Sequence, residues 1–381
     1  MRRVALLLAA TLLPLQGAAA SVGAVPSAAD APIAYLYDVS SGQVLFEREA
    51  DRRFMPASIT KAMTTLLAFD WIASGKIDLR QRYVMDRETF AEWASVGSTM
   101  YLPVDALASV DDLLAGTAAV SANDGAVLLA RGAAGSVAKW TAAMTRKARS
   151  LGMVDSRFNT PNGWMDEGRT FTTARDLGRL GTALATRHPT LYDRYVGQTQ
   201  FVYNDIMQYN HDPITGRVPG ADGIKTGFTN QAGHGFLGSA ERDGRRLVMV
   251  IAASPRQNQR NRAARRLIEW GFAAFDSIRL FGSDEVVGLA EVQGGSERTV
   301  ALVSPRAIRV TVPRGARPDI KLSIRYAGPV RAPFKAGQRI AALEIRQDDS
   351  LLATAPLYAA TAIEEANWTQ SARNALISWF S

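Results

Sequence analysis

The feature that most constrains the fold is a change of residue pattern near position 280. Before it, apolar runs with helical periodicity alternate with strand-like runs. After it only strand-like runs remain, at 285–289, 298–302, 308–312, 320–326, 339–345 and 350–356. Their spacing, with turn residues between them, is typical of a small β-sandwich. Because 381 residues also exceed the usual size of one domain, we predict a larger first domain over 21–279 and a β-sandwich domain over 280–361.

The region before this boundary predicts a mixed domain. Runs at 33–38 and 44–47 flank a glycine-containing turn and indicate a β-hairpin. Strand patterning returns at 222–228 and again at 246–252, and several apolar helical runs lie in between. We therefore predict an α/β fold of the α+β type, in which helices flank an antiparallel sheet.

The first twenty residues are organised like a cleavable secretory signal. Arg2 and Arg3 precede an apolar stretch over 4–15, and small residues follow at 18–20. A retained membrane anchor is the alternative, but the stretch is shorter than the roughly 20 residues that a membrane span needs. We predict that 1–20 is a signal peptide and that the protein is exported.

Composition adds little more. The chain has no cysteine, which excludes disulfides and thiolate sites. Its formal charge of +8 falls to +6 without Arg2 and Arg3. Such mild basicity is no argument for nucleic acid as a partner.

The first motif with chemical meaning is Ser58-Ile59-Thr60-Lys61, at the predicted start of an apolar helix. Residues three apart lie on one helical face, so the Lys61 amine can reach the Ser58 hydroxyl. A serine beside a base is the arrangement that covalent catalysis needs, provided that burial lowers the lysine pKa from about 10.4. The alternative is that Ser58 merely caps the helix.

The second motif is Ser121-Ala122-Asn123, in a small-residue loop between two apolar helical runs. Either polar side chain could serve only as a helix cap. In the functional interpretation, Ser121 relays a proton and the Asn123 amide donates to a substrate carbonyl.

The third motif is Lys225-Thr226-Gly227, in a run that predicts an edge strand along which a peptide could lie. Gly227 permits close backbone approach there. The later 233–238 segment fits a dinucleotide-binding pattern by its glycines, but it lacks the βαβ context and the following acidic residue, so we reject that interpretation. An arginine cluster starting at Arg256 is predicted to enter a helix, and one member could clamp a carboxylate.

Other signals are weaker. His188 and His211 lie in predicted loops without the spacing of metal ligands, so neither a metal site nor a histidine-based triad is supported. The segment 159–164 is rich in turn residues and predicts a surface loop.

The three motifs, in this order and at long intervals, resemble the signature set of penicillin-recognising serine enzymes. With their flanking residues they closely resemble the low-molecular-mass penicillin-binding proteins that are serine D-alanyl-D-alanine carboxypeptidases (S11-like peptidases), from about residue 33 to the C-terminus. The resemblance implies a penicilloyl serine transferase (β-lactamase-like) fold, no cofactor, peptidoglycan stem peptide as substrate and β-lactams as covalent inhibitors.

The resemblance also implies a role for each motif residue. Ser58 is acylated by the penultimate D-alanine with Lys61 as base, and Ser121 passes a proton to the departing D-alanine. The resemblance further implies that Asn123 holds the substrate amide and that Lys225 adds positive potential. It implies that Thr226 and Arg260 bind the terminal carboxylate. The backbone N–H groups of Ser58 and of Phe228, next to Gly227, are implied to form the oxyanion hole. Two positions depart from the pattern. Phe228 stands where some relatives have histidine, and His234 where tyrosine is frequent.

Three alternatives share this signature. A DD-endopeptidase uses identical chemistry on cross-linked peptides. A serine β-lactamase is disfavoured by the second domain and by the lack of a recognisable deacylating glutamate motif. An inactive binder of cell-wall peptide is disfavoured by the intact motifs.

The last twenty residues, 362–381, predict an amphipathic helix. Trp368, Leu376 and Trp379 share one face at 100° per residue, with polar residues opposite. The resemblance implies that this helix attaches the protein to the periplasmic surface of the inner membrane. The alternative is a helix docked on its own domain.

Overall fold

The computed structural model describes residues 23–347 and 349–367. The N-terminal part of this range is built on a five-stranded sheet in the order β2-β1-β9-β8-β7, and every neighbouring pair is antiparallel. Its strands are β1 (Ile33–Asp38), β2 (Gln43–Arg48), β7 (Ala221–Thr229), β8 (Gly233–Arg242) and β9 (Arg245–Ser254). The predicted antiparallel sheet is confirmed, and β7 is an edge strand as expected.

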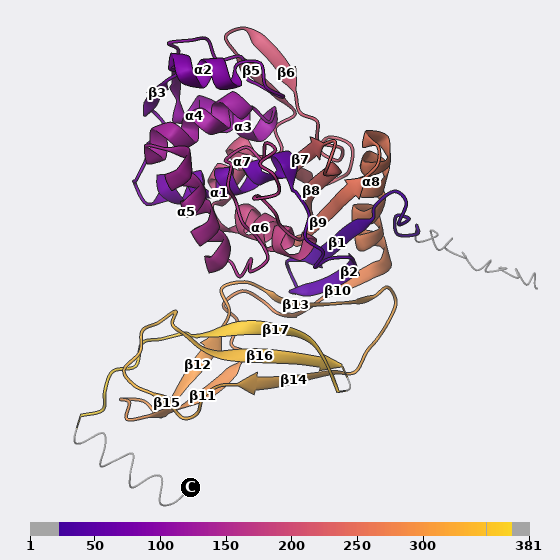
Figure 1. Cartoon of the computed structure of the whole chain (residues 1–381). Helices are drawn as coiled ribbons and strands as arrows, with labels where there is room; N and C mark the ends of the chain where they lie inside the picture. The colour runs from indigo at the N-terminus through magenta and orange to yellow at the C-terminus, as the bar shows by residue number, and fades with distance from the viewer. Residues whose placement is uncertain (1–22, 348, 368–381) are drawn as a thin grey trace, which may run out of the picture.

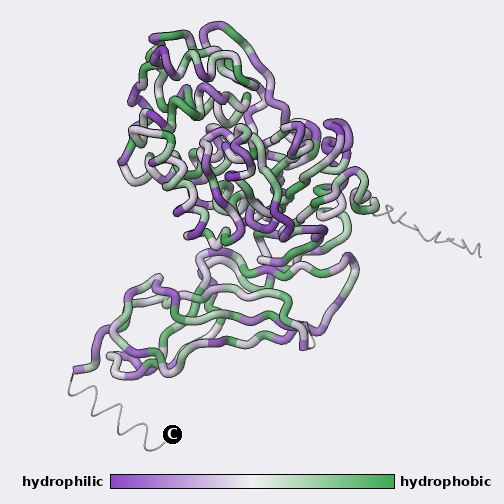
Figure 2. The backbone as a smooth tube through the Cα atoms, in the orientation of Figure 1, coloured by the Kyte–Doolittle hydropathy of each residue, from purple (hydrophilic) through white to green (hydrophobic). Residues whose placement is uncertain are grey.

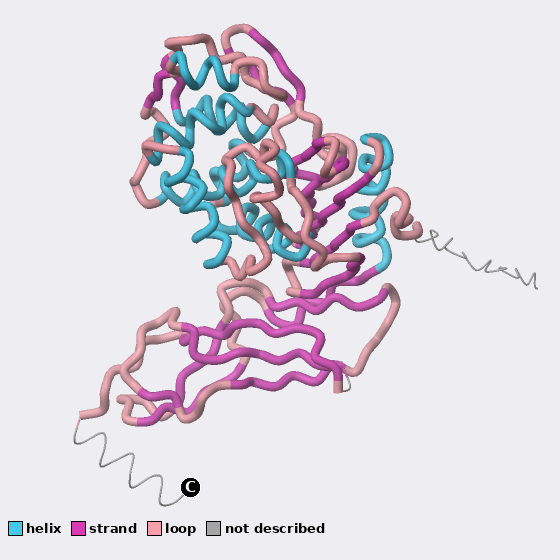
Figure 3. Tube along the Cα trace, viewed as in Figure 1, coloured by secondary structure: helices cyan, strands magenta, loops and turns pink. Residues whose placement is uncertain are grey.

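Helices cover both faces of this sheet (Figure 3). One face carries α6 (Ala174–Arg187), and further helices lie beyond α6 on the same side. They are α1 (Thr60–Ala73), α2 (Arg87–Trp93), α3 (Val110–Ala119), α4 (Asn123–Ala134), α5 (Val137–Ser150) and α7 (Pro189–Tyr195). The other face carries α8 (Gln257–Ala274), whose Ala263, Ala264 and Leu267 are fully buried among strand residues. Helix α1 is buried along most of its length, because its residues are almost all apolar or small.

Two short antiparallel strand pairs lie on the helical side. Strands β3 (Arg82–Val84) and β4 (Leu107–Ser109) pair beside α3, and β5 (Gln200–Tyr203) pairs with β6 (Ile206–Tyr209). Helix α3 begins with the capping box formed by Ser109 and Asp112. A serine followed three positions later by an acidic residue is the sequence pattern of such a box.

In the described C-terminal part, residues 275–347 and 349–367, all regular elements are strands (Figure 1). A six-stranded sheet in the order β14-β16-β17-β12-β11-β15 packs against the pair β10-β13. The strands are β10 (Phe275–Phe281), β11 (Gly288–Gln293), β12 (Thr299–Val303), β13 (Ile308–Pro313), β14 (Ile320–Arg325), β15 (Val330–Arg331), β16 (Arg339–Gln347) and β17 (Ser350–Ala359). Hydrophobic and hydrophilic residues alternate along these strands (Figure 2), as a two-layered β structure requires.

Two strands of the C-terminal part were absent from the sequence prediction. β10 follows α8 without a break and spans the predicted boundary at 279, since helix and strand join at Phe275 with no turn residue between them. β15 has only two residues. The predicted signal peptide, 1–20, lies outside the described residues.

The predicted C-terminal helix is wrong for its first residues. Ile363 is buried and forms a β-bridge with Phe334, and Glu365 bridges Gly295, so 362–367 is extended. The remainder of the predicted helix, 368–381, lies outside the described residues. Within the described residues, no helix combines the length and apolarity needed to cross a membrane.

Candidate active site

Ser58 lies in a single 3₁₀ turn, Ala57–Ile59, which leads directly into α1. Its Oγ is 2.9 Å from Nζ of Lys61, so the predicted contact across three residues is present. The turn has no side-chain cap and the N-cap position of α1 is Ile59, which argues against capping as the role of Ser58. Ala57 adopts a φ of +49°, a conformation unusual for a residue with a Cβ. The serine is therefore presented by a locally strained backbone.

Lys61 is completely buried at the centre of the site. Besides Ser58, its Nζ lies 2.7 Å from Oδ1 of Asn123 and 2.9 Å from the carbonyl oxygen of Asn162. Burial lowers the pKa of this amine well below its usual value, and the nearby Lys225 ammonium lowers it further, while Asp124 acts in the opposite direction. The environment thus favours the neutral amine that a general base requires.

The second motif faces Lys61 from the start of α4. Asn123 is buried, and its Nδ2 donates to the carbonyl oxygen of Val96 at 2.7 Å, which leaves Oδ1 toward Lys61. Ser121 has a φ of +66° and lines the cleft beside Ser58. The N-cap of α4 is Ala122 and no side chain caps the helix, so the capping interpretation of Ser121 and Asn123 is wrong.

Asp124, the residue after this motif, binds the backbone of the segment that follows Gly97 and Ser98. Its buried carboxylate accepts hydrogen bonds from the backbone N–H groups of Met100, Leu102 and Gly125. Burial raises the pKa of this carboxyl despite these bonds. The segment around Gly97 and Ser98 is thereby fixed against the start of α4.

The third motif lies on β7. Lys225 is buried, and burial together with the Arg260 guanidinium lowers its pKa to about 7. Arg260, on α8, is also buried, donates from Nη1 to the carbonyl oxygen of Gly235 at 3.0 Å, and has a pKa lowered to about 10 by burial. This end of the site therefore concentrates positive potential in a poorly hydrated environment, which suits an anion.

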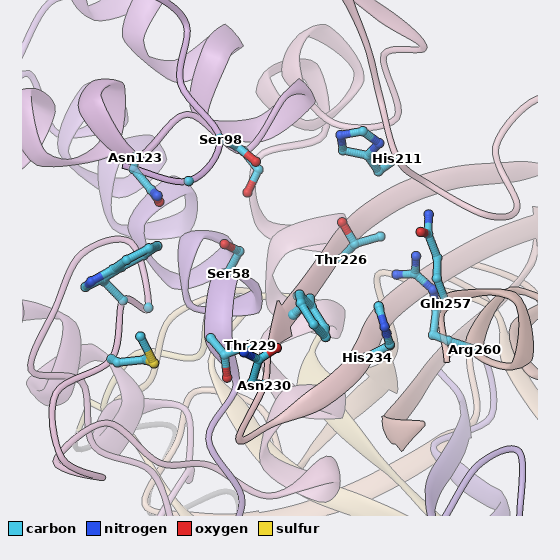
Figure 4. A pocket seen from close by; sticks show the side chains of 17 residues that line it. Ser58, Ser98, Asn123, His211, Thr226, Thr229, Asn230, His234, Gln257 and Arg260 are labelled. Carbon is cyan, nitrogen blue, oxygen red and sulfur yellow. The ribbon is translucent and has the colours of Figure 1, made fainter. Parts of the chain in front are cut away.

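The three motifs meet in one cleft of about 500 Å³ (Figure 4). Seven of the nine predicted site residues line it, namely Ser58, Ser121, Asn123, Thr226, Gly227, Phe228 and Arg260. The other two, Lys61 and Lys225, lie buried behind this lining. Figure 4 shows Asn123 and Thr226 on opposite sides of Ser58, with Arg260 beyond Thr226.

Several cleft residues were missed from the sequence. Gly97, Ser98, Trp164, His211 and Gln257 all line the cleft, and they come from loops or from a helix start without a local signature. His211 was noticed only as a loop residue.

The interpretation of 159–164 as a surface loop is wrong. Asn162 is 1% exposed and its carbonyl oxygen contacts Lys61. Gly163 has a φ of +76°, and a Cβ there would come within 1.8 Å of the carbonyl oxygen of Ala57. The turn residues serve a tight internal bend, and the Asn-Gly pair was the signal for it.

The two departures from the family pattern are in contact with each other. The rings of Phe228 and His234 stack with centroids 4.1 Å apart and planes 20° from parallel. Phe228 is about half exposed, at 51%, so the stacked pair presents an aromatic surface at the edge of the cleft. Burial, and then Arg260, lowers the pKa of His234.

Comparison with known proteins decides the family. The profile of the D-alanyl-D-alanine carboxypeptidase family matches residues 20–255, which is more than half of the chain. The chain belongs to this family. A second profile, that of the penicillin-binding protein 5 C-terminal domain, matches residues 275–365.

Individual relatives agree with this assignment. The D-alanyl-D-alanine carboxypeptidase DacC of Escherichia coli is 30% identical, over 88% of this chain and 85% of its own length. The crystal structure of penicillin-binding protein 5 from Haemophilus influenzae has a TM-score of 0.77 at 28% identity, covering 90% of this chain and all of that one. Penicillin-binding protein D2 from Listeria monocytogenes, solved with bound ampicillin, has a TM-score of 0.58 at 27% identity, covering 64% of this chain and 98% of that one.

Proposed function

We propose that the cleft binds the D-Ala-D-Ala terminus of a peptidoglycan stem pentapeptide and removes the last D-alanine through an acyl-enzyme on Ser58. Family membership makes the chain a serine D-alanyl-D-alanine carboxypeptidase. The observation that carries the mechanism is the 2.9 Å contact between Ser58 Oγ and the fully buried Nζ of Lys61.

The surroundings of Lys61 suit a neutral amine. Such an amine has two N–H donors and one lone pair. The donors match Asn123 Oδ1 and the Asn162 carbonyl oxygen, which are both within 2.9 Å. The lone pair is then directed at Ser58, whose hydroxyl can donate to it.

Acylation proceeds in two steps. Ser58 Oγ bonds to the carbonyl carbon of the penultimate D-alanine while Lys61 takes the hydroxyl proton, and the N–H groups of Ser58 and Phe228 stabilise the oxyanion. The C–N bond then breaks as Ser121 passes a proton to the leaving amine. Water subsequently hydrolyses the ester and regenerates Ser58.

The terminal carboxylate belongs at the positive end of the cleft. Thr226 offers a hydroxyl there, and Lys225 and Arg260 supply charge. Asn123 lies on the other side of Ser58 and would hold the amide of the acyl portion. β-Lactams carry a carboxylate and a strained amide, so they fit the same contacts and acylate Ser58.

The export and membrane assignments are parts of the same proposal. The pattern of 1–20 supports secretion to the periplasm. Aromatic and apolar residues within 368–381 support peripheral attachment to the inner membrane. Deleting 368–381, which spares the Ile363 bridge, should release the protein from anionic vesicles, and unchanged sedimentation would contradict attachment.

The decisive assay is D-alanine release from a pentapeptide ending in D-Ala-D-Ala. We expect release by the wild type and none by Ser58→Ala or Lys61→Ala, whereas Ser74→Ala, at the exposed end of α1, should behave like the wild type. Release that survives in Ser58→Ala would overturn the mechanism. Cleavage of cross-linked dimers only would assign an endopeptidase.

A further inference from the structure

A second, smaller cavity adjoins the cleft on its positive side. It has a volume of about 220 Å³, and it shares His211 and Gln257 with the cleft. The residues that matter in its lining are His211, Asp212, Arg217, Gln257, Asn261 and Arg265. Figure 4 shows His211 and Gln257 on the same side of Ser58 as Thr226 and Arg260. The cavity therefore continues the cleft beyond the position of the terminal carboxylate.

The cavity is lined mainly by positive and polar groups. Arg217 and Arg265 face it from the 210–218 loop and from α8, and neither forms an ion pair with a carboxylate within the described part of the chain. Among the described residues, the Arg217 guanidinium donates only to the backbone oxygen of Asp212, at 3.2 Å. Unpaired guanidinium groups around a polar cavity are suited to binding an anion.

The carboxylate of the one acidic residue in this lining already accepts hydrogen bonds from its own loop. Asp212 is buried, and its Oδ1 accepts from the N–H groups of Ile214 and Thr215, while Oδ2 accepts from the Thr215 hydroxyl at 2.7 Å. These bonds hold the 210–218 loop in place. The Asp212 carboxylate is therefore committed to the loop and is not directed at the arginines.

We propose that this cavity is a second leaving-group subsite, which binds a carboxylate carried by the leaving residue in addition to its α-carboxylate. The inference rests on the proposed function. A terminal D-alanine has no such group and leaves the cavity empty. A leaving residue with an acidic side chain places its side-chain carboxylate there.

The chemistry of the step is unchanged by this binding. Ser58 Oγ still bonds to the D-alanine carbonyl carbon, the amide C–N bond breaks and the leaving amine gains a proton. The cavity changes only the affinity of the site for different leaving residues. The cavity thus predicts substrate selectivity toward acidic leaving residues.

The test compares peptides that end in D-Ala-D-Glu and D-Ala-D-Gln, which are nearly isosteric. We expect the wild type to have a kcat/KM about fivefold higher for D-Glu, because two partly exposed ion pairs give a modest gain. The Arg217→Gln/Arg265→Gln variant should reduce this ratio to about one, with D-Ala-D-Ala turnover changed less than twofold.

The matched control is Arg266→Gln, which removes the same charge from an exposed position one residue further along α8. It should keep the preference. The preference of the wild type should be strongest at low salt and weaker at high salt, because salt screens ion pairs. Arg265→Gln alone, which leaves the Arg217 bond to the loop intact, should lower the ratio part of the way.

Two outcomes would overturn the inference. One is a wild-type ratio of one or less, and the other is a preference that survives in the double variant. Failure of the proposed function is distinguishable, because the wild type would then release nothing from D-Ala-D-Ala either.

Discussion

Gly227 lies so close to Pro56 that a Cβ at position 227 would come within 2.6 Å of the Pro56 carbonyl oxygen and 3.1 Å of the Ile59 backbone nitrogen. Both neighbours are backbone atoms, so neither can move aside cheaply. This contact sets the distance between strand β7 and the turn that carries Ser58. The glycine of the third motif therefore positions the first motif.

We expect Gly227→Ala to push β7 away from Ser58 and to slow acylation by fluorescent penicillin about 100-fold, since small misplacements of a catalytic group are costly. Stopped-flow labelling would measure this rate. The control is Gly282→Ala, whose added Cβ meets no backbone atom and comes closest to the flexible carboxylate end of Glu285, at 3.2 Å. Equal acylation rates in the two variants would show that the close contact is unimportant.

Replacing Asn162 by Asp tests whether Lys61 is the base. The side-chain Oδ1 that accepts from the Trp164 N–H is retained, and the lost Nδ2 has no partner among the described residues. The added negative charge stabilises the Lys61 ammonium and raises its pKa, so the acid limb of the acylation pH profile should move up by about one unit. His211→Gln should leave that limb in place. A limb that follows His211 instead would contradict the assignment.

The motifs could be predicted from sequence because their chemistry is local. The spacing of Ser58 and Lys61 on one helical face needs no tertiary information, and neither does the capping box of α3. The antiparallel sheet followed from alternation of apolar residues. These features depend on neighbours within a few positions.

The rest of the site could not be predicted, because it is made by contacts between distant segments. The carbonyl of Asn162 reaches Lys61 across 101 positions of sequence, and a turn-rich segment gives no sign of being buried. His211 reaches the cleft only because the loop after β6 folds over α8. Strand β10 was missed because no turn residue separates it from that helix.

Lys225 destabilises the fold that it serves. It is buried, with a single weak contact from Nζ to the Thr226 carbonyl oxygen at 3.4 Å, and its pKa is lowered to about 7. Below pH 7 the buried amine is charged in the folded state, so the free energy of unfolding is lowered by the full cost of burying an ammonium group. The cost shrinks as the pH rises toward the ordinary lysine pKa, because only the unfolded chain then holds the proton.

Lys225→Met should therefore be more stable than the wild type although its affinity for anionic substrates falls. Urea denaturation should show an advantage of on the order of 4–5 kcal/mol at pH 6 that is about 3 kcal/mol smaller at pH 9. Lys76→Met, at an exposed position, serves as the control and should show no gain in stability at pH 6. A pH-independent advantage would mean that packing, and not charge burial, is responsible.

A buried polar cluster joins the two parts of the molecule. The Thr311 hydroxyl, on β13, donates to Oδ2 of Asp38 at 2.7 Å, and the same oxygen accepts from Nε of Arg245 at 2.7 Å. Gln43 adds a pair of hydrogen bonds to the backbone of Thr311. Asp38 is completely buried, so these partners take the place of water around its carboxylate.

Thr311→Val should remove one hydrogen-bond donor to Asp38 with little change in side-chain volume. We expect it to lower the free energy of unfolding by about 1–3 kcal/mol. The loss lies at the junction, so calorimetry should show the β-rich part unfolding at lower temperature, separately from the N-terminal part. Penicillin acylation at 25 °C should be unaffected, because β1 is separated from β7 by two strands of the sheet. Thr299→Val, exposed on β12, provides the matched control. If both variants unfold like the wild type, the polar cluster does not hold the two parts together.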